Sequence, residues 1–377
     1  MKPETRRIVY IIIAIVIVVG IVLGITLGVV LNKDKEKQDT QTDEVEPEII
    51  NSYNNTDELL EKYPLENNVT IRPGLERNIL NRLLTGFENW NRGFKAWKAW
   101  GKILYTEDSI YNVNGVRLSL AHYQNAMDVA LKQVNIVLGV FHNIVVNDNY
   151  TAIYYDSTQV KGDYINPGTV MEFVLFKDYG ETLGTRVVEG WGGTKGSSYD
   201  SMTAFQDEKE KEIQMQQLNE MLDYDIPETS NLKEKYIIKH PTNYIDENAE
   251  DILKIVYEQF DAWNQDEDLA NYTEWVRNNY DSNATIVILQ KNKTLEEYLT
   301  DSMATAQNKT ITKLYFDNIL IRDNWAALHY RYRTYDKITK EKYAGDRMQF
   351  LKFEQVDDIN IPVLVSNSFS SEISKSV

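Results

Sequence analysis

The chain repeats itself, and this repeat constrains the fold more than any other feature of the sequence. The segment Phe141–Tyr155 (FHNIVVNDNYTAIYY) aligns without a gap with Phe316–Tyr330 (FDNILIRDNWAALHY), and seven of the fifteen positions are identical. Composition alone would give about one identity in such a pair. We therefore expect one structural unit to be folded twice along the chain.

A second match lies upstream, in two segments whose apolar residues recur at helical spacing. These residues are Ile79, Leu80, Leu83, Leu84, Phe87 and Trp90 in the first copy, and Ile252, Leu253, Val256, Tyr257, Phe260 and Trp263 in the second. Such spacing places them on one face of a helix. Each segment ends in Trp-Asn, at Trp90-Asn91 and at Trp263-Asn264.

The pattern predicts two helices, a short strand, a third helix and four strands in each copy. In the first copy the helices are expected at 76–90, 93–104 and 116–131, and the strands at 134–147, 150–160, 169–178 and 184–191. Asp148-Asn149 and Asp323-Asn324 separate strand runs, where such residues favour tight turns. Met171, Phe173 and Leu175 form one apolar face of a strand and Val174 and Phe176 lie on the other, so the sheet should be covered on both sides.

The remaining segments complete the predicted organisation. We expect a cytoplasmic tail at 1–7, a transmembrane helix at 8–31, a polar spacer at 32–74, the first domain at 75–195, a helical connector at 196–246, a divergent second domain at 247–372 and a tail at 373–377.

The transmembrane prediction rests on Ile8–Leu31, which is 24 residues long and carries no charge. As a helix it would span about 36 Å, against about 30 Å for the hydrocarbon core of a bilayer. The run continues directly into Asn32-Lys33 without a cleavage site, which favours an anchor in membrane lipid over a signal peptide. Arg6 and Arg7 favour a cytoplasmic amino terminus, with the domains on the extracytoplasmic side.

Composition excludes several classes of function. The net charge is −17, so the surface repels phosphate backbones, and we expect no nucleic-acid partner. The absence of cysteine excludes disulfides, thiolate nucleophiles and zinc–thiolate sites. The four histidines lack the spacing of a metal motif, and no Gly-x-Ser-x-Gly elbow occurs. We expect neither a metal nor a cofactor.

The last strand of the first copy carries Val187, Glu189 and Trp191, an apolar-x-Glu-x-Trp pattern. With Trp-Asn near the end of the first helix, and with the helix-then-sheet order, it resembles the SnoaL-like domains of the NTF2-like superfamily. The resemblance implies an α+β fold with two cystatin-like cones, each of three helices on a curved antiparallel sheet. The family includes isomerases, cyclases, dehydratases and hydrolases, and also non-catalytic binding and dimerisation modules. The second copy departs from the pattern, because Pro362–Ser368 lacks the Glu and the Trp.

Acid–base chemistry needs a carboxylate or an imidazole with a shifted pKa that faces a donor in a dry cavity. The candidate catalytic residues are Glu172, Glu189 and His122. The alternative is that the two glutamates face solvent or pair with Arg186 or Arg117, and that the histidine is structural.

The candidate ligand-binding residues of the first copy are Tyr105, Tyr154, Asp156 and Trp191, although core packing explains such aromatics equally well. In the second copy, His329, Arg331 and Arg333 share one strand face by alternation. They could hold an anion or form an exposed basic face.

Three hypotheses for function follow. The first is a membrane-anchored surface protein whose first domain binds a small, mostly apolar ligand. The second is a non-catalytic adhesion or assembly module, as a homo-oligomer or as a pseudo-dimer of the two copies packed sheet against sheet. The third is an isomerase- or cyclase-type enzyme that uses a buried carboxylate of the first copy. A carboxylate that meets a tyrosine in a closed cavity would favour the enzyme, and large aromatics that fill the cone would favour the module.

Overall fold

The computed structural model describes residues 56–67, 69–180, 184–194, 202–244, 248–288, 291–357 and 359–375, without the side chains of residue 194 and of residues 366–375. The predicted transmembrane helix at 8–31 lies outside these residues, as do both predicted tails apart from residues 373–375. Among the described helices, none is both long and apolar enough to cross a bilayer. All of the described residues belong to one compact unit, Glu48–Val377.

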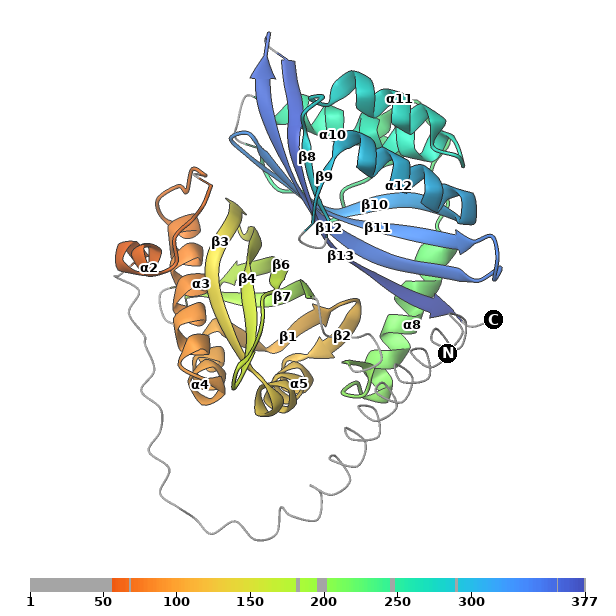
Figure 1. Cartoon of the computed structure of the whole chain (residues 1–377). Coiled ribbons are helices and arrows are strands. Elements are labelled where there is room, and N and C mark those ends of the chain that lie inside the picture. The colour runs from red at the N-terminus through yellow and green to blue at the C-terminus, as the bar shows by residue number, and fades with distance from the viewer. Residues whose placement is uncertain are drawn as a thin grey trace, which may run out of the picture. The chain divides into compact units, whose positions relative to one another are not determined.

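From the first long helix onward, helices and strands succeed one another in the same order in both copies, apart from the short strand β5 of the first (Figure 1). The first copy contains α2 (Thr56–Lys62), α3 (Leu75–Asn91), α4 (Phe94–Leu104), β1 (Tyr105–Val113), β2 (Val116–Ser119), α5 (Leu120–Gln133), β3 (Asn135–Asn147), β4 (Tyr150–Lys161), β5 (Tyr164–Asn166), β6 (Thr169–Asp178) and β7 (Thr185–Thr194). The connector holds α8 (Glu208–Leu222) and α9 (Leu232–Lys235). The second copy contains α10 (Ala249–Gln265), α11 (Ala270–Asn279), β8 (Thr285–Ile288), β9 (Lys291–Thr294), α12 (Leu295–Asn308), β10 (Lys309–Arg322), β11 (Trp325–Asp336), β12 (Lys342–Val356) and β13 (Ile359–Lys375).

The two sheets have the same topology, which confirms the duplication. The strand order is β3-β4-β6-β7-β1-β2 in the first sheet and β10-β11-β12-β13-β8-β9 in the second, with β5 added to β4. The predicted turns also match, because Asp148 and Asp323 both adopt a left-handed backbone, with φ of 51° and 52°. The α+β class is therefore confirmed.

Two details differ from the prediction. The sheets are mixed rather than antiparallel, because β1 runs parallel to β7 and β8 runs parallel to β13. The chain inserts a helix and a run of antiparallel strands between each parallel pair, so the last strand returns in the direction of the first. The third helix begins at Leu120 and not at 116, because Val116–Ser119 forms β2 and the Ser119 hydroxyl caps the helix.

Both faces of the first sheet are covered, as its two-sided apolar pattern predicts. On one face, residues such as Tyr155 and Val174 pack with Ile79 and other residues of α3, α4 and α5. On the other face, apolar residues of both sheets form one buried cluster, which we call the inter-sheet cluster. Its buried members are Val145, Tyr150, Ala152, Met171, Phe173, Trp191, Leu320, Trp325, Ala327, Met348 and Phe350.

The repeated Trp-Asn pair ties the first long helix of each copy to the equivalent strand, β3 or β10. The Trp90 indole donates to the Ile136 carbonyl at 2.8 Å, and the Asn91 side chain bonds both the carbonyl and the amide of Leu138 at 2.8 Å. The second copy makes the same bonds from Trp263 to Ile311 and from Asn264 to Lys313. The motif is therefore structural in both copies.

The repeat extends upstream of its predicted start. Tyr63 is 2% exposed and donates to Glu88 at 2.7 Å, and Tyr236 is fully buried and donates to Asp261 at 3.2 Å. Each tyrosine follows a short helix, α2 or α9. The domain boundaries remain predictions, but α2 lies inside the range expected to be spacer, and α9 lies inside the expected connector.

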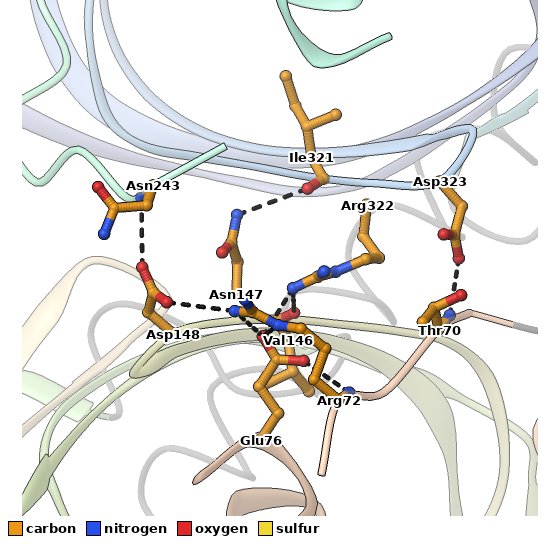
Figure 2. A network of polar contacts seen from close by, with 10 residues as sticks. All are labelled: Thr70, Arg72, Glu76, Val146, Asn147, Asp148, Asn243, Ile321, Arg322 and Asp323. Carbon is orange, nitrogen blue, oxygen red and sulfur yellow. Dashed lines mark hydrogen bonds and ion pairs between the residues drawn. The ribbon is translucent and has the colours of Figure 1, made fainter. Parts of the chain in front are cut away.

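A buried ion network joins the two copies (Figure 2). The Glu76 carboxylate accepts from Arg72 and from Arg322, each at 2.6 Å, and Arg322 also donates to the Val146 carbonyl at 3.0 Å. The aspartates of the two Asp-Asn turns form further hydrogen bonds at the edges of this network. The Asp323 carboxylate accepts from the Thr70 amide, and the Asp148 carboxylate accepts from the Asn243 amide.

Candidate functional site

One carboxyl group of the first copy lies among four tyrosines between the helices and the sheet. We call Glu172, Tyr105, Tyr111, Tyr123 and Tyr155 the Glu172 cluster. The Tyr155 hydroxyl donates to Glu172 Oε1 at 2.8 Å, and Tyr111 makes a second hydrogen bond to this carboxyl group. The ring of Tyr111 stacks on that of Tyr123, with 4.4 Å between centroids. Strands β1, β4 and β6 and helix α5 thus converge on one group.

Glycines of β7 make room for this arrangement. A Cβ atom on Gly190 would lie 2.4 Å from Cε2 of Tyr111, so only glycine leaves space for the ring. The cross-strand neighbour of Glu172 is Gly192, which has no side chain to cover it, and Glu172 is only partly buried as a residue. The strand expected at 184–191 extends further than predicted, because β7 continues to Thr194.

The environment favours the neutral form of each group in the cluster. Burial raises the pKa of Glu172, and the hydrogen bonds from Tyr155 and Tyr111 only partly oppose this effect. Burial also raises the pKa of Tyr105, Tyr111, Tyr123 and Tyr155, and the Glu172 charge adds to the effect. Among the described residues, no basic side chain pairs with Glu172. A neutral carboxyl group can both donate and accept a hydrogen bond.

Aromatic rings occupy much of the remaining interior of the first copy. Phe87 stacks on Phe141 with centroids 4.7 Å apart, and Trp97 meets Tyr123 edge to face at 5.7 Å. In the second copy, a hollow of about 20 Å³ borders Trp263 and leaves room for about one water molecule. The interior of the first copy therefore combines two features. A carboxyl group meets tyrosines, as the enzyme hypothesis expects, and large aromatic side chains surround them, as the adhesion or assembly hypothesis expects.

The structure brings Tyr105 to Glu172 but places three other ligand candidates on the opposite face of the sheet. Trp191 belongs to the inter-sheet cluster, and Tyr154 packs against it. Asp156 bonds Nε2 of His142 at 2.6 Å, and Glu66 bonds Nδ1 of this ring at 2.7 Å. Burial lowers the pKa of His142, but these two hydrogen bonds outweigh it, so the pKa is raised.

Glu189 lies away from the Glu172 cluster. Its carboxylate pairs with Arg117 at 3.4 Å, as the structural alternative anticipated, and also bonds the Asn112 side chain. Both partners come from the β1–β2 hairpin. Its contacts therefore hold the hairpin against β7.

His122 also has a structural partner. Its Nδ1 lies 2.8 Å from Glu210 of α8, and the Glu210 carboxylate also accepts from the Ser119 and Asp207 amides. His122, Asp207 and Glu210 could bring three ligand atoms within 4.8 Å of one another. These groups cap two helices, and we assign no metal to them.

The basic strand face of the second copy is not exposed, so that expectation is wrong. His329 is 1% exposed, bonds Asp346 at 2.9 Å and lies against Trp191 of the first copy, with 5.5 Å between ring centroids. Arg331 pairs with Asp317, and Arg333 donates to carbonyls at the end of α8. The first copy and the connector cover this face.

Sequence reasoning missed Tyr111, Tyr123 and Tyr155 as members of the site. Alternation along β4 already separates Tyr155 from Tyr154 onto opposite faces. It cannot show that β1 lies beside β7, which is the pairing that brings Tyr111 across two glycines to Glu172.

No family model matches the sequence, and no curated protein matches it significantly. Solved structures resemble part of the chain. A candidate SnoaL-like polyketide cyclase from Jannaschia sp. CCS1 is 8% identical over 34% of this chain and 90% of its own, with a TM-score of 0.28. An NTF2-like protein of unknown function from Shewanella oneidensis is 17% identical over 32% and 98%, with a TM-score of 0.24. A cystatin-like protein of unknown function from Nostoc punctiforme is 12% identical over 33% and 93%, also with a TM-score of 0.24. At such scores, no functional conclusion follows.

Proposed function

We propose that the first copy binds a small, mostly apolar ligand with one carbonyl or hydroxyl group, and that Glu172 and Tyr155 hydrogen-bond that group. The proposal rests on one observation, the carboxyl group held between two phenols without a basic partner. Burying such a group costs free energy, and the rest of the fold does not require it. The aligned residue of the second copy is Gln349, so the acid is specific to one copy.

A pair of probes that differ only in the polar group tests this proposal. Tetralone carries a carbonyl group and tetralin does not. We expect tetralone to bind the full-length protein more tightly in titration calorimetry, since a neutral hydrogen bond contributes about 1 kcal/mol, or about fivefold in affinity. Glu172→Leu should remove most of this preference, whereas Gln349→Leu, at the aligned position, should leave it intact.

Equal binding of tetralone and tetralin would overturn the proposal. So would a preference for tetralone that survives Glu172→Leu. Far-UV circular dichroism of each variant establishes that the fold is retained.

The Tyr155–Glu172 pair also supports the enzyme hypothesis, because a carboxyl group beside a phenol can move a proton to and from a carbonyl compound. If the site is catalytic, the wild type should speed the exchange of the tetralone α-hydrogens in deuterated water. Glu172→Gln, which keeps a hydrogen-bond donor but cannot transfer the proton, should bind tetralone without this acceleration. Exchange at the uncatalysed rate would leave the first copy as a binding site only.

We further propose that the two copies form an intramolecular pseudo-dimer. The inter-sheet cluster supports this arrangement, because it buries large side chains of both sheets, including Trp191 and Phe350. A pseudo-dimer would direct the two sets of helices away from each other. This is the geometry that the adhesion or assembly hypothesis requires.

The anchor at residues 8–31 and the extracytoplasmic location of the domains are part of the same proposal. We expect the full-length protein to stay in the membrane fraction after alkaline extraction. Deletion of residues 8–31 should release it, and protease added outside intact cells should digest the domains. Recovery of the full-length protein in the soluble fraction would contradict the anchor.

A further inference from the structure

Two basic side chains lie on the helix-facing side of the second sheet, where the first copy has apolar residues at the equivalent strand positions. Lys313 on β10 is 5% exposed, and Arg347 lies on β12, two strands away. Register places Lys313 opposite Tyr332 and places Arg347 opposite Tyr330, both on the intervening strand β11. Since Tyr330 packs into the core beneath α10, this face of the sheet points toward the helices.

Aromatic rings surround the Lys313 ammonium. Its Nζ lies 4.4 Å from the ring centroid of Trp263, 4.6 Å from that of Phe260, 5.5 Å from that of Tyr272 and 5.6 Å from that of Tyr330. We call these residues, with Arg347, the Lys313 cluster. Ring faces attract a cation, but they do not replace the hydrogen bonds that an ammonium loses on leaving water.

The described residues provide no negative charge for either cation. No described carboxylate forms an ion pair with Lys313 or Arg347, and Nε of Arg347 is buried without a hydrogen-bond partner. Arg347 hydrogen-bonds Tyr330 and lies over the ring of Tyr332. Burial lowers the pKa of Lys313, and the Arg347 charge lowers it further. A guanidinium keeps its proton, so Arg347 carries a charge that no described carboxylate neutralises.

The first copy shows that the fold itself does not need these cations. By the repeat alignment, Lys313 corresponds to Leu138, Arg347 to Val170, and Gln349 to Glu172. Three changes on equivalent strands therefore replace an acidic interior with a basic one. A difference of this kind indicates a different ligand rather than a different fold.

We propose that the interior of the second copy binds a small organic carboxylate, held by Arg347 and Lys313. A guanidinium presents paired N–H groups that match a carboxylate, and the unpartnered Nε belongs to this pair. The surrounding rings suit a short apolar body. Because aromatic rings already lie close around Lys313, the ligand is a short-chain acid of the size of acetate or propionate.

Thermal unfolding and titration calorimetry of the full-length protein with propionate test this inference, with propionamide as the neutral isostere at the same ionic strength. Propionate should raise Tm and bind at one site, and propionamide should not. Replacement of the two cations by the residues of the first copy (Lys313→Leu with Arg347→Val) should weaken propionate binding at least tenfold. These residues already suit the same strands in the first copy, so the variant is expected to fold.

The matched control is Glu172→Leu in the first copy, which should leave propionate binding unchanged. This control separates carboxylate binding in the second copy from tetralone binding in the first copy, because either proposal can fail without the other. Saturation-transfer NMR with propionate and unmodified protein provides a readout that requires no variant. The inference is wrong if propionate gives no transfer, if propionamide binds as well, if inorganic phosphate displaces propionate and alone raises Tm, or if the double variant binds propionate as the wild type does.

Discussion

Glu172 should link the stability of the protein to pH. Burial raises its pKa, so the folded state holds this proton to a higher pH than the unfolded chain, in which a glutamate has a pKa of about 4.3. Above that value the folded state binds more protons than the unfolded state. The contribution of Glu172 to stability therefore falls as pH rises, until the raised pKa is passed.

Glu172→Gln keeps the shape of the side chain and removes this titration. Urea unfolding from about pH 4 to about pH 8 should show the wild type losing stability relative to the variant as pH rises. Glu296→Gln is the matched control. Its hydrogen bond to Arg277 lowers its pKa, so any slope should have the opposite sign. Parallel curves for the wild type and Glu172→Gln would contradict the account.

The Trp-Asn motif leads to a second prediction at this scale. Asn264→Ala would leave the amide and the carbonyl of Lys313 without their partners, at a cost of about 1–3 kcal/mol in the free energy of unfolding. Asn91→Ala should cost a similar amount, because it makes the same bonds to Leu138. Chemical denaturation measures both losses, with exposed Asn271→Ala as the control. Losses no larger than that of the control would contradict a structural role for the motif.

Among the elements, β7 depends most on glycine. Gly190→Ala would place a methyl group 2.4 Å from the Tyr111 ring, and overpacking of this kind costs about 1–3 kcal/mol. Gly139→Ala on β3 is the matched control, since its Cβ would make only ordinary contact, 3.5 Å from the Asp156 Cβ. Unfolding of both variants in urea measures the difference. Equal stability of the two variants would show that the Tyr111 ring can move aside.

Local periodicity was enough to predict most elements of the first copy. The apolar face that includes Ile79 and Leu83 marked α3 to within a residue at each end, and the Asp-Asn turns marked the boundary between β3 and β4. The strand β2 was missed because its four residues carry too short a pattern to be told from the following helix. The parallel pairing of β1 with β7 was missed because it joins segments far apart in the chain.

The same limit explains the candidate site. The sequence identified Glu172 and Tyr105, which the fold brings together, because each lies in an element with a clear pattern. Sequence reasoning also placed Trp191 and Asp156 in this site, although they lie on the other face of the sheet. Which strand face lines the interior cannot be assigned until the neighbours of the sheet are known. Once the first copy is seen to cover the second sheet, the buried position of His329 also has a physical reason.

At the scale of the whole molecule, the Glu76–Arg322 pair couples the two copies. Both side chains are nearly inaccessible, and removal of one partner from a buried pair is strongly destabilising. Because Arg72 still pairs with Glu76, we expect Arg322→Met to lower the free energy of unfolding by about 1–3 kcal/mol. Urea denaturation should also separate into two transitions as the copies uncouple.

The matched control for this variant is Arg277→Met, which removes one partner of the exposed pair with Glu296. Arg277→Met should lower the free energy of unfolding much less, because water solvates the exposed Glu296 carboxylate once its partner is removed. A single transition with equal losses in the two variants would show that the Glu76–Arg322 contact does not couple the copies.

The two copies share a topology but differ in the ionisable groups of their interiors. Glu172 makes the first interior acidic, and Lys313 with Arg347 makes the second basic. One chain could thereby present two sites of different ligand preference on a single scaffold. The claim on which the proposed function depends is that the acid of the first interior is neutral at neutral pH.

Infrared difference spectroscopy between the wild type and Glu172→Gln at neutral pH tests that claim most directly. The account predicts a carbonyl stretch of a protonated carboxylic acid in the wild type that is absent from the variant and that shifts in deuterated water. A difference spectrum that shows only carboxylate bands at neutral pH would mean that Glu172 is ionised, and the proposed site would then lack its neutral hydrogen-bond donor.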